Sequence, residues 1–119
     1  MHTFLGPPTI TFISNYTVSL EGDKVFLLCI AINDVHANHS LQIKWYKGNK
    51  LVARNGKHIQ VYNKIGKASR QLRSTLLFDP ISHTDDGEYT CRAFNHPDSY
   101  SESKTNLCVE CEIASYLCI

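Results

Sequence analysis

Apolar and polar residues alternate with a period of two along much of the chain. The alternation is clearest at residues 25–31 and 41–45, and it returns at residues 75–81, where Leu76, Phe78 and Ile81 are core candidates. A period of two is typical of a β-strand that buries one of its faces. The pattern therefore predicts three half-buried strands.

Shorter strand-like runs fill most of the remaining chain. We expect them at residues 9–14, 16–21, 51–53, 58–62, 91–95 and 101–110. Residues 33–40 are polar and predict a long loop, and short polar or glycine-containing turns separate the other runs. About eight short strands with no convincing helix indicate an all-β, two-sheet antiparallel sandwich.

One constellation of residues is more specific than this pattern. The run Asp85-Asp86-Gly87-Glu88-Tyr89-Thr90-Cys91 has the form D-x-G-x-Y-x-C, Cys29 lies 62 positions before Cys91, and the single tryptophan is Trp45. This arrangement resembles the immunoglobulin superfamily. The longer pattern from Leu76 through Phe78 and Ile81 to Asn95 resembles the intermediate, or I-set, type of that family, with a variable-type sandwich as the alternative.

The resemblance implies a role for each residue of the constellation. It implies an immunoglobulin-like sandwich with Greek-key connections, in which a Cys29–Cys91 disulfide joins the two sheets. It further implies that Trp45 packs against the disulfide and that the Tyr89 side chain ties down the preceding turn. Asp85 and Leu76 are expected to be structural residues of this core.

The length of 119 residues fits one domain. We expect a linker at residues 1–6, an I-set domain at residues 7–110 and a cysteine-containing tail at residues 111–119. The first residues do not resemble a signal peptide, and no apolar stretch is long enough to cross a bilayer. Structural cysteines and glycosylation motifs nevertheless favour a fragment of a secreted or cell-surface protein over a cytosolic domain.

The charge is distributed unevenly, although the net charge is only +1. No acidic residue falls between Asp34 and Asp79, and this stretch holds nine of the twelve lysines and arginines: Lys44, Lys47, Lys50, Arg54, Lys57, Lys64, Lys67, Arg70 and Arg73. We expect them to gather on one side of the domain. They either form a basic edge that attracts sulfated glycans or an acidic protein face, with Lys57, Lys64 and Lys67 as candidates, or are solvated faces with one cation paired to Asp85.

A second candidate surface consists of Tyr46, Arg92 and Phe94. Their parity predicts that they point outward from adjacent strands. Aromatic residues beside arginine are typical of protein interfaces, although packing alone explains them equally. Binding to nucleic acid is not expected, because the chain has neither an overall basic excess nor an aromatic stacking platform.

The loops carry histidines and two glycosylation motifs. His36, His39 and His96 are expected to meet at one end of the sandwich, where loop histidines are either simply solvated or form a pH-responsive contact. No carboxylate or cysteine completes a ligand set with them apart from Asp98, so a metal site is not predicted. Asn15 and Asn38 each begin an N-x-[ST] motif and are candidates for N-glycosylation.

Three cysteines remain once Cys29 and Cys91 are paired. Cys108 is expected to face outward from the last strand, and Cys111 and Cys118 follow it. The C-x-x-C spacing does not open a helix, which argues against a redox site, and no fourth zinc ligand is evident. An odd count predicts a free thiol or a homodimer through Cys108, Cys111 or Cys118.

These observations predict a binding module without a cofactor. No nucleophile with a partnered base and no phosphate-binding loop is present, so we do not expect an enzyme. The first hypothesis is an extracellular immunoglobulin-like module of an adhesion or receptor protein that recognises a protein partner. The alternatives are a non-binding spacer in a tandem array or intracellular scaffold, and a truncated soluble form that dimerises through its tail.

Overall fold

The computed structural model describes residues 6–52, 56, 58–66 and 70–110, which form nine strands and one short 3-10 turn. The elements are β1 (Thr9–Ile13), β2 (Thr17–Leu20), β3 (Val25–Ile32), β4 (Gln42–Lys47), β5 (Lys50–Leu51), β6 (Ile59–Ile65), β7 (Gln71–Phe78), η1 (His83–Asp85), β8 (Gly87–His96) and β9 (Ser99–Glu110). The predicted strands are confirmed, although β7 and β8 each begin four residues earlier and β6 extends three residues further than expected.

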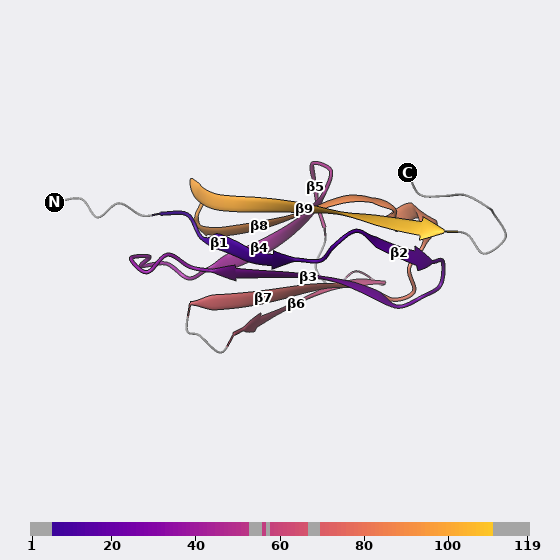
Figure 1. Cartoon of the computed structure of the whole chain (residues 1–119), viewed down its shortest axis with the longest axis horizontal. Coiled ribbons are helices and arrows are strands. Elements are labelled where there is room, and N and C mark those ends of the chain that lie inside the picture. Colours follow the sequence, from indigo (N-terminus) through magenta and orange to yellow (C-terminus); the bar gives the residue numbers. More distant parts are fainter. Residues whose placement is uncertain (1–5, 53–55, 57, 67–69, 111–119) are drawn as a thin grey trace.

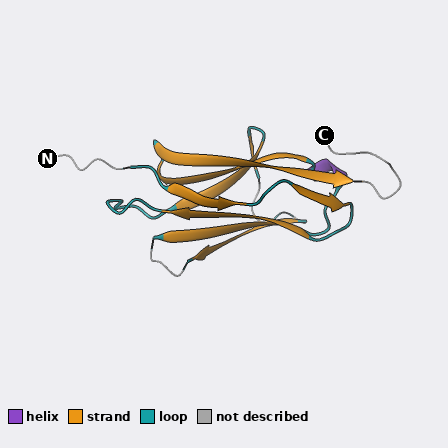
Figure 2. Ribbon diagram, viewed as in Figure 1, coloured by secondary structure: helices purple, strands orange, loops and turns teal. Residues whose placement is uncertain are grey.

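The strands form two stacked sheets. A four-stranded sheet has the order β1-β3-β7-β6, and a five-stranded sheet has the order β2-β9-β8-β4-β5. Figure 1 shows β8 and β9 in the upper layer and β3, β6 and β7 in the lower one, and Figure 2 shows that strands dominate the fold. Strands that follow one another in the sequence, such as β3 and β4, belong to different sheets. The connections are therefore of the predicted Greek-key type.

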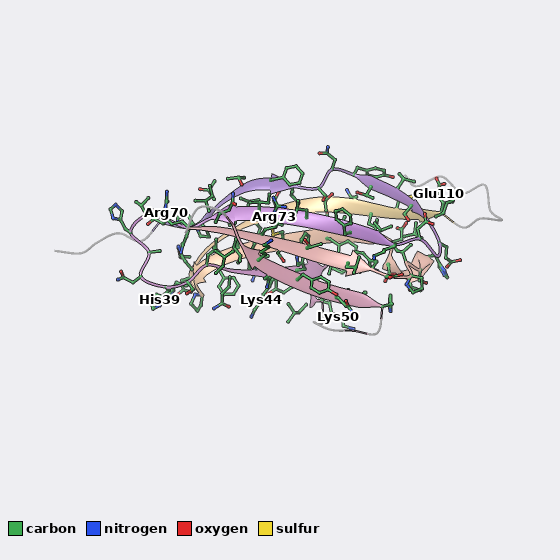
Figure 3. The ribbon with its side chains drawn as sticks, turned by 90° about the horizontal axis from the view of Figure 1, so that it is seen from below. His39, Lys44, Lys50, Arg70, Arg73 and Glu110 are labelled. Carbon is green, nitrogen blue, oxygen red and sulfur yellow. A yellow bond between two sulfur atoms is a disulfide. The ribbon has the colours of Figure 1, made fainter. Side chains whose placement is uncertain are left out.

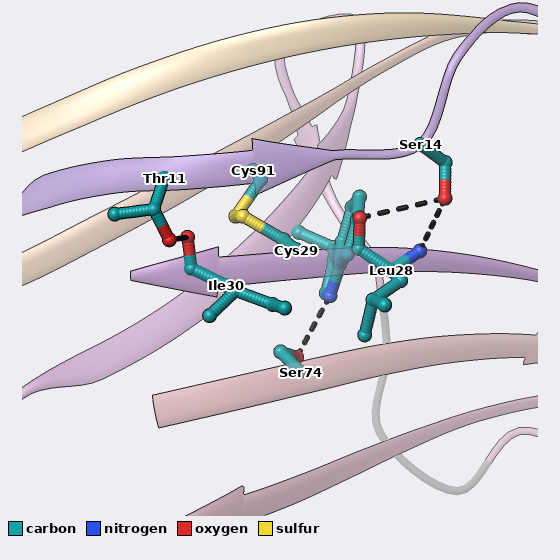
Figure 4. Close-up of a disulfide and its surroundings, with 8 residues drawn as sticks. Thr11, Ser14, Leu28, Cys29, Ile30, Ser74 and Cys91 are labelled. Atoms are coloured by element: carbon teal, nitrogen blue, oxygen red, sulfur yellow. Dashed lines mark hydrogen bonds between the residues drawn. A yellow bond between two sulfur atoms is a disulfide. The ribbon is translucent and has the colours of Figure 1, made fainter. Parts of the chain in front are cut away.

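The core lies between the sheets, where the inward parities meet. Leu27, Leu76 and Phe78 are fully buried, and Trp45 is 1% exposed. The predicted disulfide is present: Cys29 on β3 and Cys91 on β8 are bonded and belong to the same buried cluster as Trp45. Figure 4 shows this bond joining the two layers. The structural roles expected for this part of the constellation are therefore confirmed.

The turn before β8 is organised by Tyr89 and Asp85. The Tyr89 hydroxyl donates to the Asp85 carbonyl oxygen over 2.6 Å, as the sequence pattern predicts. The Asp85 side chain is 6% exposed, and its carboxylate accepts from the Ser82 amide at 2.8 Å and lies 3.3 Å from His58 Nε2. The expectation that a lysine or arginine pairs with Asp85 is not met within the described residues, because the His58 imidazole occupies that side of the carboxylate.

The segment that precedes β1 is tied to the loop between β3 and β4. The Gly6 amide donates to Asp34 Oδ2 at 3.1 Å, and Asn95 Nδ2 donates to the Gly6 carbonyl oxygen at 3.1 Å. Ser101 on β9 donates to the carbonyl oxygen of Pro8 over 2.5 Å. These bonds hold the segment from Gly6 to Pro8 across one end of the sandwich. No helix in the described residues is long and apolar enough to span a bilayer.

Candidate partner-binding surface

The outer side of the five-stranded sheet carries a continuous cluster of aromatic and charged side chains. Since Trp45 and Cys91 point into the core, the residues that alternate with them point outward. We call this surface the front face, and it comprises Gln42, Lys44 and Tyr46 on β4, Arg92 and Phe94 on β8, and Tyr100 and Glu102 on β9. The register places Arg92 directly between Lys44 and Glu102.

Arg92 lies at the centre of the front face. Its guanidinium carbon is 4.9 Å from the ring centroid of Tyr46 and 4.7 Å from that of Tyr100. Glu102 Oε2 accepts from Arg92 Nη2 at 2.7 Å and from Nε at 2.8 Å. The hydrogen bonds to Glu102 raise the pKa of Arg92 above its ordinary value. The guanidinium is therefore held in one orientation between two rings, which lowers the entropy that binding would cost.

The other aromatic rings of the front face also lie beside a cation or are exposed to solvent. Lys44 Nζ lies 5.4 Å from the centroid of the Phe94 ring. Tyr100 is 46% exposed, and Leu51 on the neighbouring edge strand is 51% exposed. A surface that combines accessible aromatic and apolar groups with an arginine has the composition of a protein-binding face.

The sequence predicted part of this cluster and missed the rest. Tyr46, Arg92 and Phe94 were expected to point outward from adjacent strands, and the structure places them on one face. Tyr100 and Glu102 were not singled out, although their parity and their positions opposite Phe94 and Arg92 in the last hairpin contain the necessary signal.

The basic stretch does not form a patch on one sheet. Lys64 on β6 lies opposite Arg73 on β7, and both are exposed on the four-stranded sheet, whereas Lys44 and Lys50 belong to the five-stranded sheet. Figure 3 shows Arg73 over the four-stranded sheet, with Lys44 and Lys50 along its lower margin. Arg54, Lys57 and Lys67 lie outside the described residues. The described cations of this stretch are thus divided between two sheets.

Two of the three loop histidines come together as expected. The rings of His39 and His96 lie with their centroids 6.3 Å apart, and His96 Nδ1 accepts from the Asp98 amide at 3.2 Å. Among the described residues, no group of three or more histidine, cysteine or carboxylate side chains is arranged to hold a metal ion.

Both predicted glycosylation acceptors lie in exposed loops. Asn38 is in the loop between β3 and β4, and Asn15 is in the short connection between β1 and β2. The Thr17 hydroxyl donates to the Asn15 carbonyl oxygen at 2.9 Å. Neither asparagine side chain is buried by the fold.

Cys108 differs from its prediction. It has the outward parity of β9, but it is only 2% exposed and is disulfide-bonded. The expectation of an exposed thiol at this position is therefore wrong, because parity reports the direction of a side chain and not whether something covers it. Cys111 and Cys118 lie outside the described residues.

Residues 7–95 match the family model described as "Immunoglobulin domain". Human junctional adhesion molecule A is 26% identical over 88 residues, and macrophage colony-stimulating factor 1 receptor 2 of Takifugu rubripes is 28% identical over 105 residues. These alignments cover 74% and 88% of this chain, but the chain spans only 27% and 10% of the respective relatives.

Solved structures agree with this assignment at the level of the fold. The N-terminal Ig1-2 module of the Drosophila receptor protein tyrosine phosphatase DLAR superimposes with a TM-score of 0.76 at 22% identity, covering 90% of this chain and 50% of that one. The family match extends over most of the described strands and includes the Cys29–Cys91 disulfide, the buried Trp45 and the Tyr89 that fixes the turn before β8. The chain belongs to the immunoglobulin domain family.

Proposed function

We propose that this domain is an extracellular recognition module of an adhesion or receptor protein and that it binds a protein partner through its front face. The observation that carries the proposal is the fixed position of Arg92 between Tyr46 and Tyr100. Relatives named as an adhesion molecule and a receptor support the class of protein. The disulfide supports an oxidising, extracellular compartment.

The chemistry of the front face favours a folded protein as the partner. The aromatic rings offer apolar area, and Arg92 and Lys44 offer charge that an acidic partner surface would complement. Because Glu102 already neutralises Arg92 in part, a partner carboxylate must compete with it or bind beside it. We therefore expect modest affinity that depends on the whole cluster.

A binding screen with matched variants tests this proposal. The protein, made in a secretory host and oligomerised for avidity, is applied to an array of purified extracellular domains that includes this domain itself. Arg92→Glu should reduce any binding more than tenfold, because it reverses the central charge. Arg73→Glu is the control, since Arg73 is an exposed arginine on the opposite sheet.

The outcome separates the hypotheses. If Arg73→Glu abolishes binding and Arg92→Glu leaves it intact, the partner binds the four-stranded sheet and not the front face. An array that yields no partner would favour the spacer.

A second candidate is the binding of sulfated glycans. It is supported by the neighbouring exposed side chains of Lys64 and Arg73, for which no ion pair is found within the described residues. Changing Lys57, Lys64 and Lys67 together to glutamate should then abolish salt-sensitive retention of the protein on heparin. If the parent protein elutes from heparin at the lowest salt, this candidate is rejected.

A further inference from the structure

The outer side of the four-stranded sheet carries a row of apolar residues beside the charged side chains of Lys64 and Arg73. Residues Leu27, Cys29 and Ala31 of β3 fill the core, so the intervening residues of this strand point outward, and they are apolar as well. We call this surface the back face, and its apolar members are Phe12, Phe26, Leu28, Ile30, Tyr62 and Leu77. Phe26 is 61%, Tyr62 54% and Phe12 46% exposed. A group of exposed apolar side chains is typical of a surface that another group covers.

An irregularity in β1 places Phe12 on the back face. Ile10 pairs with Ala31 and Ile13 with Cys29, so both isoleucines lie over the core. The register shifts between Ile10 and Phe12, which sets Phe12 opposite Ile30 and turns its ring outward. The aromatic ring therefore lies at the β1 border of the back face.

The first glycosylation motif, which begins at Asn15, follows β1 directly in the chain. The Ser14 amide donates to the Leu28 carbonyl oxygen at 2.9 Å. The Leu28 amide donates to Ser14 Oγ at 2.7 Å, and Figure 4 draws this second bond. Asn15 is the next residue, and its own carbonyl oxygen accepts from Thr17. Because Phe12 is three residues earlier, the two residues lie within about 10 Å of each other along the chain.

We propose that Asn15 carries an N-linked glycan whose first sugars pack on the Phe12 ring and cover the β1 side of the back face. In this modification the Asn15 amide nitrogen bonds to the anomeric carbon of N-acetylglucosamine and loses one proton. The lipid pyrophosphate that carries the donor oligosaccharide leaves. The C–H groups of a sugar ring are attracted to the negative face of an aromatic ring, and their contact removes apolar area from water.

A covalently attached glycan fits this border better than a second protein does. Asn15 is exposed in the connection between β1 and β2, so an oligosaccharide attached to it would extend beside β1 and obstruct a protein on that side of the sheet. The glycan would leave the centre of the front face open, since the connection that holds Asn15 leads into β2, and β9 lies between β2 and the strand that carries Arg92. This inference rests on the extracellular location proposed above, but it does not depend on any partner.

The Asn38 motif provides a matched control within the same molecule. It lies in an exposed loop, and the residue three positions earlier is Val35, which has no aromatic face. A glycan on Asn38 should therefore be attached without stabilising the domain or covering the back face.

The test uses the protein made in a secretory host, with peptide mass mapping to measure occupancy at both sites. We expect Asn15 to be occupied and Asn15→Gln to lower the Tm by about 4 °C. In a Phe12→Ser background the same change should have almost no effect. Binding of the dye ANS should rise severalfold for Asn15→Gln and stay unchanged for Asn38→Gln. Enzymatic trimming of the parent protein's glycans repeats the comparison without any mutation.

Three results would overturn the inference. The first is an unmodified Asn15, whatever the state of Asn38. The second is an equal loss of Tm with and without Phe12. The third is ANS binding that does not respond to the Asn15 glycan. Partner binding that still depends on Arg92 in the Asn15→Gln protein would leave the proposed function standing even if the glycan inference failed.

Discussion

Trp45 Nε1 donates a hydrogen bond to Ser74 Oγ, 2.9 Å away, between the two sheets. Ser74 is fully buried on β7 and lies opposite Cys29, so a polar pair stands beside the disulfide in an otherwise apolar core. A buried indole N–H that loses its acceptor keeps the cost of its desolvation. The pair therefore ties the two sheets to one relative position.

Ser74→Ala should lower the free energy of unfolding by about 1–3 kcal/mol, because the indole N–H is left without its acceptor. Urea denaturation of both proteins measures the difference. In a Trp45→Phe background, where no N–H needs an acceptor, the same change should cost clearly less. Equal costs in the two backgrounds would show that packing, and not the hydrogen bond, explains the loss.

His58 is the second position where a small change should have a defined effect. Its imidazole lies 3.3 Å from the buried Asp85 carboxylate, so His58→Ala should cost about 1 kcal/mol. His58→Arg supplies a permanently charged donor and should retain or exceed the stability of the parent protein. His83→Ala is the matched control, because His83 and its partner Glu21 are both exposed. A larger loss for the control than for His58→Ala would contradict this account.

The core could be predicted from the sequence because burial on one face imposes a repeated pattern. The parities of Leu27, Cys29, Trp45 and Leu76 are all borne out, since each strand must present one face to the same interior. Exceptions to the pattern could not be predicted. The register shift before Phe12 reverses the parity of the following residues, and no residue type in that segment marks it.

The sequence could predict which residues of the candidate surface point outward from one strand, but not which residues of neighbouring strands meet. Outward parity indicated Tyr46 and Arg92, but the ring of Tyr100 and the carboxylate of Glu102 reach Arg92 because of cross-strand register. That register depends on the length and geometry of the last hairpin. Cys108 illustrates the same limit, because its direction followed from parity while its burial did not.

Gly87 should be more sensitive to substitution by alanine than Gly22, another glycine with positive φ. Its φ is +146°, and a Cβ there would lie 3.1 Å from Lys47 Cε, whereas Gly22 has φ +96° with open space around it. Gly22→Ala adds backbone strain alone, of about 1–2 kcal/mol, and Gly87→Ala adds a displacement of the Lys47 side chain as well. Thermal unfolding should therefore rank Gly87→Ala below Gly22→Ala. The reverse order would show that the Lys47 contact yields without cost.

Tyr89 should make the domain lose stability in alkaline solution. Burial raises the pKa of its phenol, and the negative charges of Asp85 and Asp86 raise it further. The unfolded chain releases this proton near pH 10 and the folded chain only at higher pH, so above about pH 10 the unfolded state binds fewer protons. Stability contributed by the neutral phenol is therefore complete below pH 10 and is lost as the pH rises, by up to about 1.4 kcal/mol per pH unit.

Tyr89→Phe separates this effect from the hydrogen bond that the same hydroxyl makes. At pH 7 the variant should be less stable by about 1–3 kcal/mol, because the Asp85 carbonyl oxygen loses the donor 2.6 Å away. Above pH 10 the difference should shrink, since phenylalanine has no proton to lose. Denaturant midpoints between pH 7 and pH 11 measure both quantities. Parallel curves for the two proteins across that range would mean that the phenol does not control alkaline unfolding, whereas converging curves assign the loss to Tyr89.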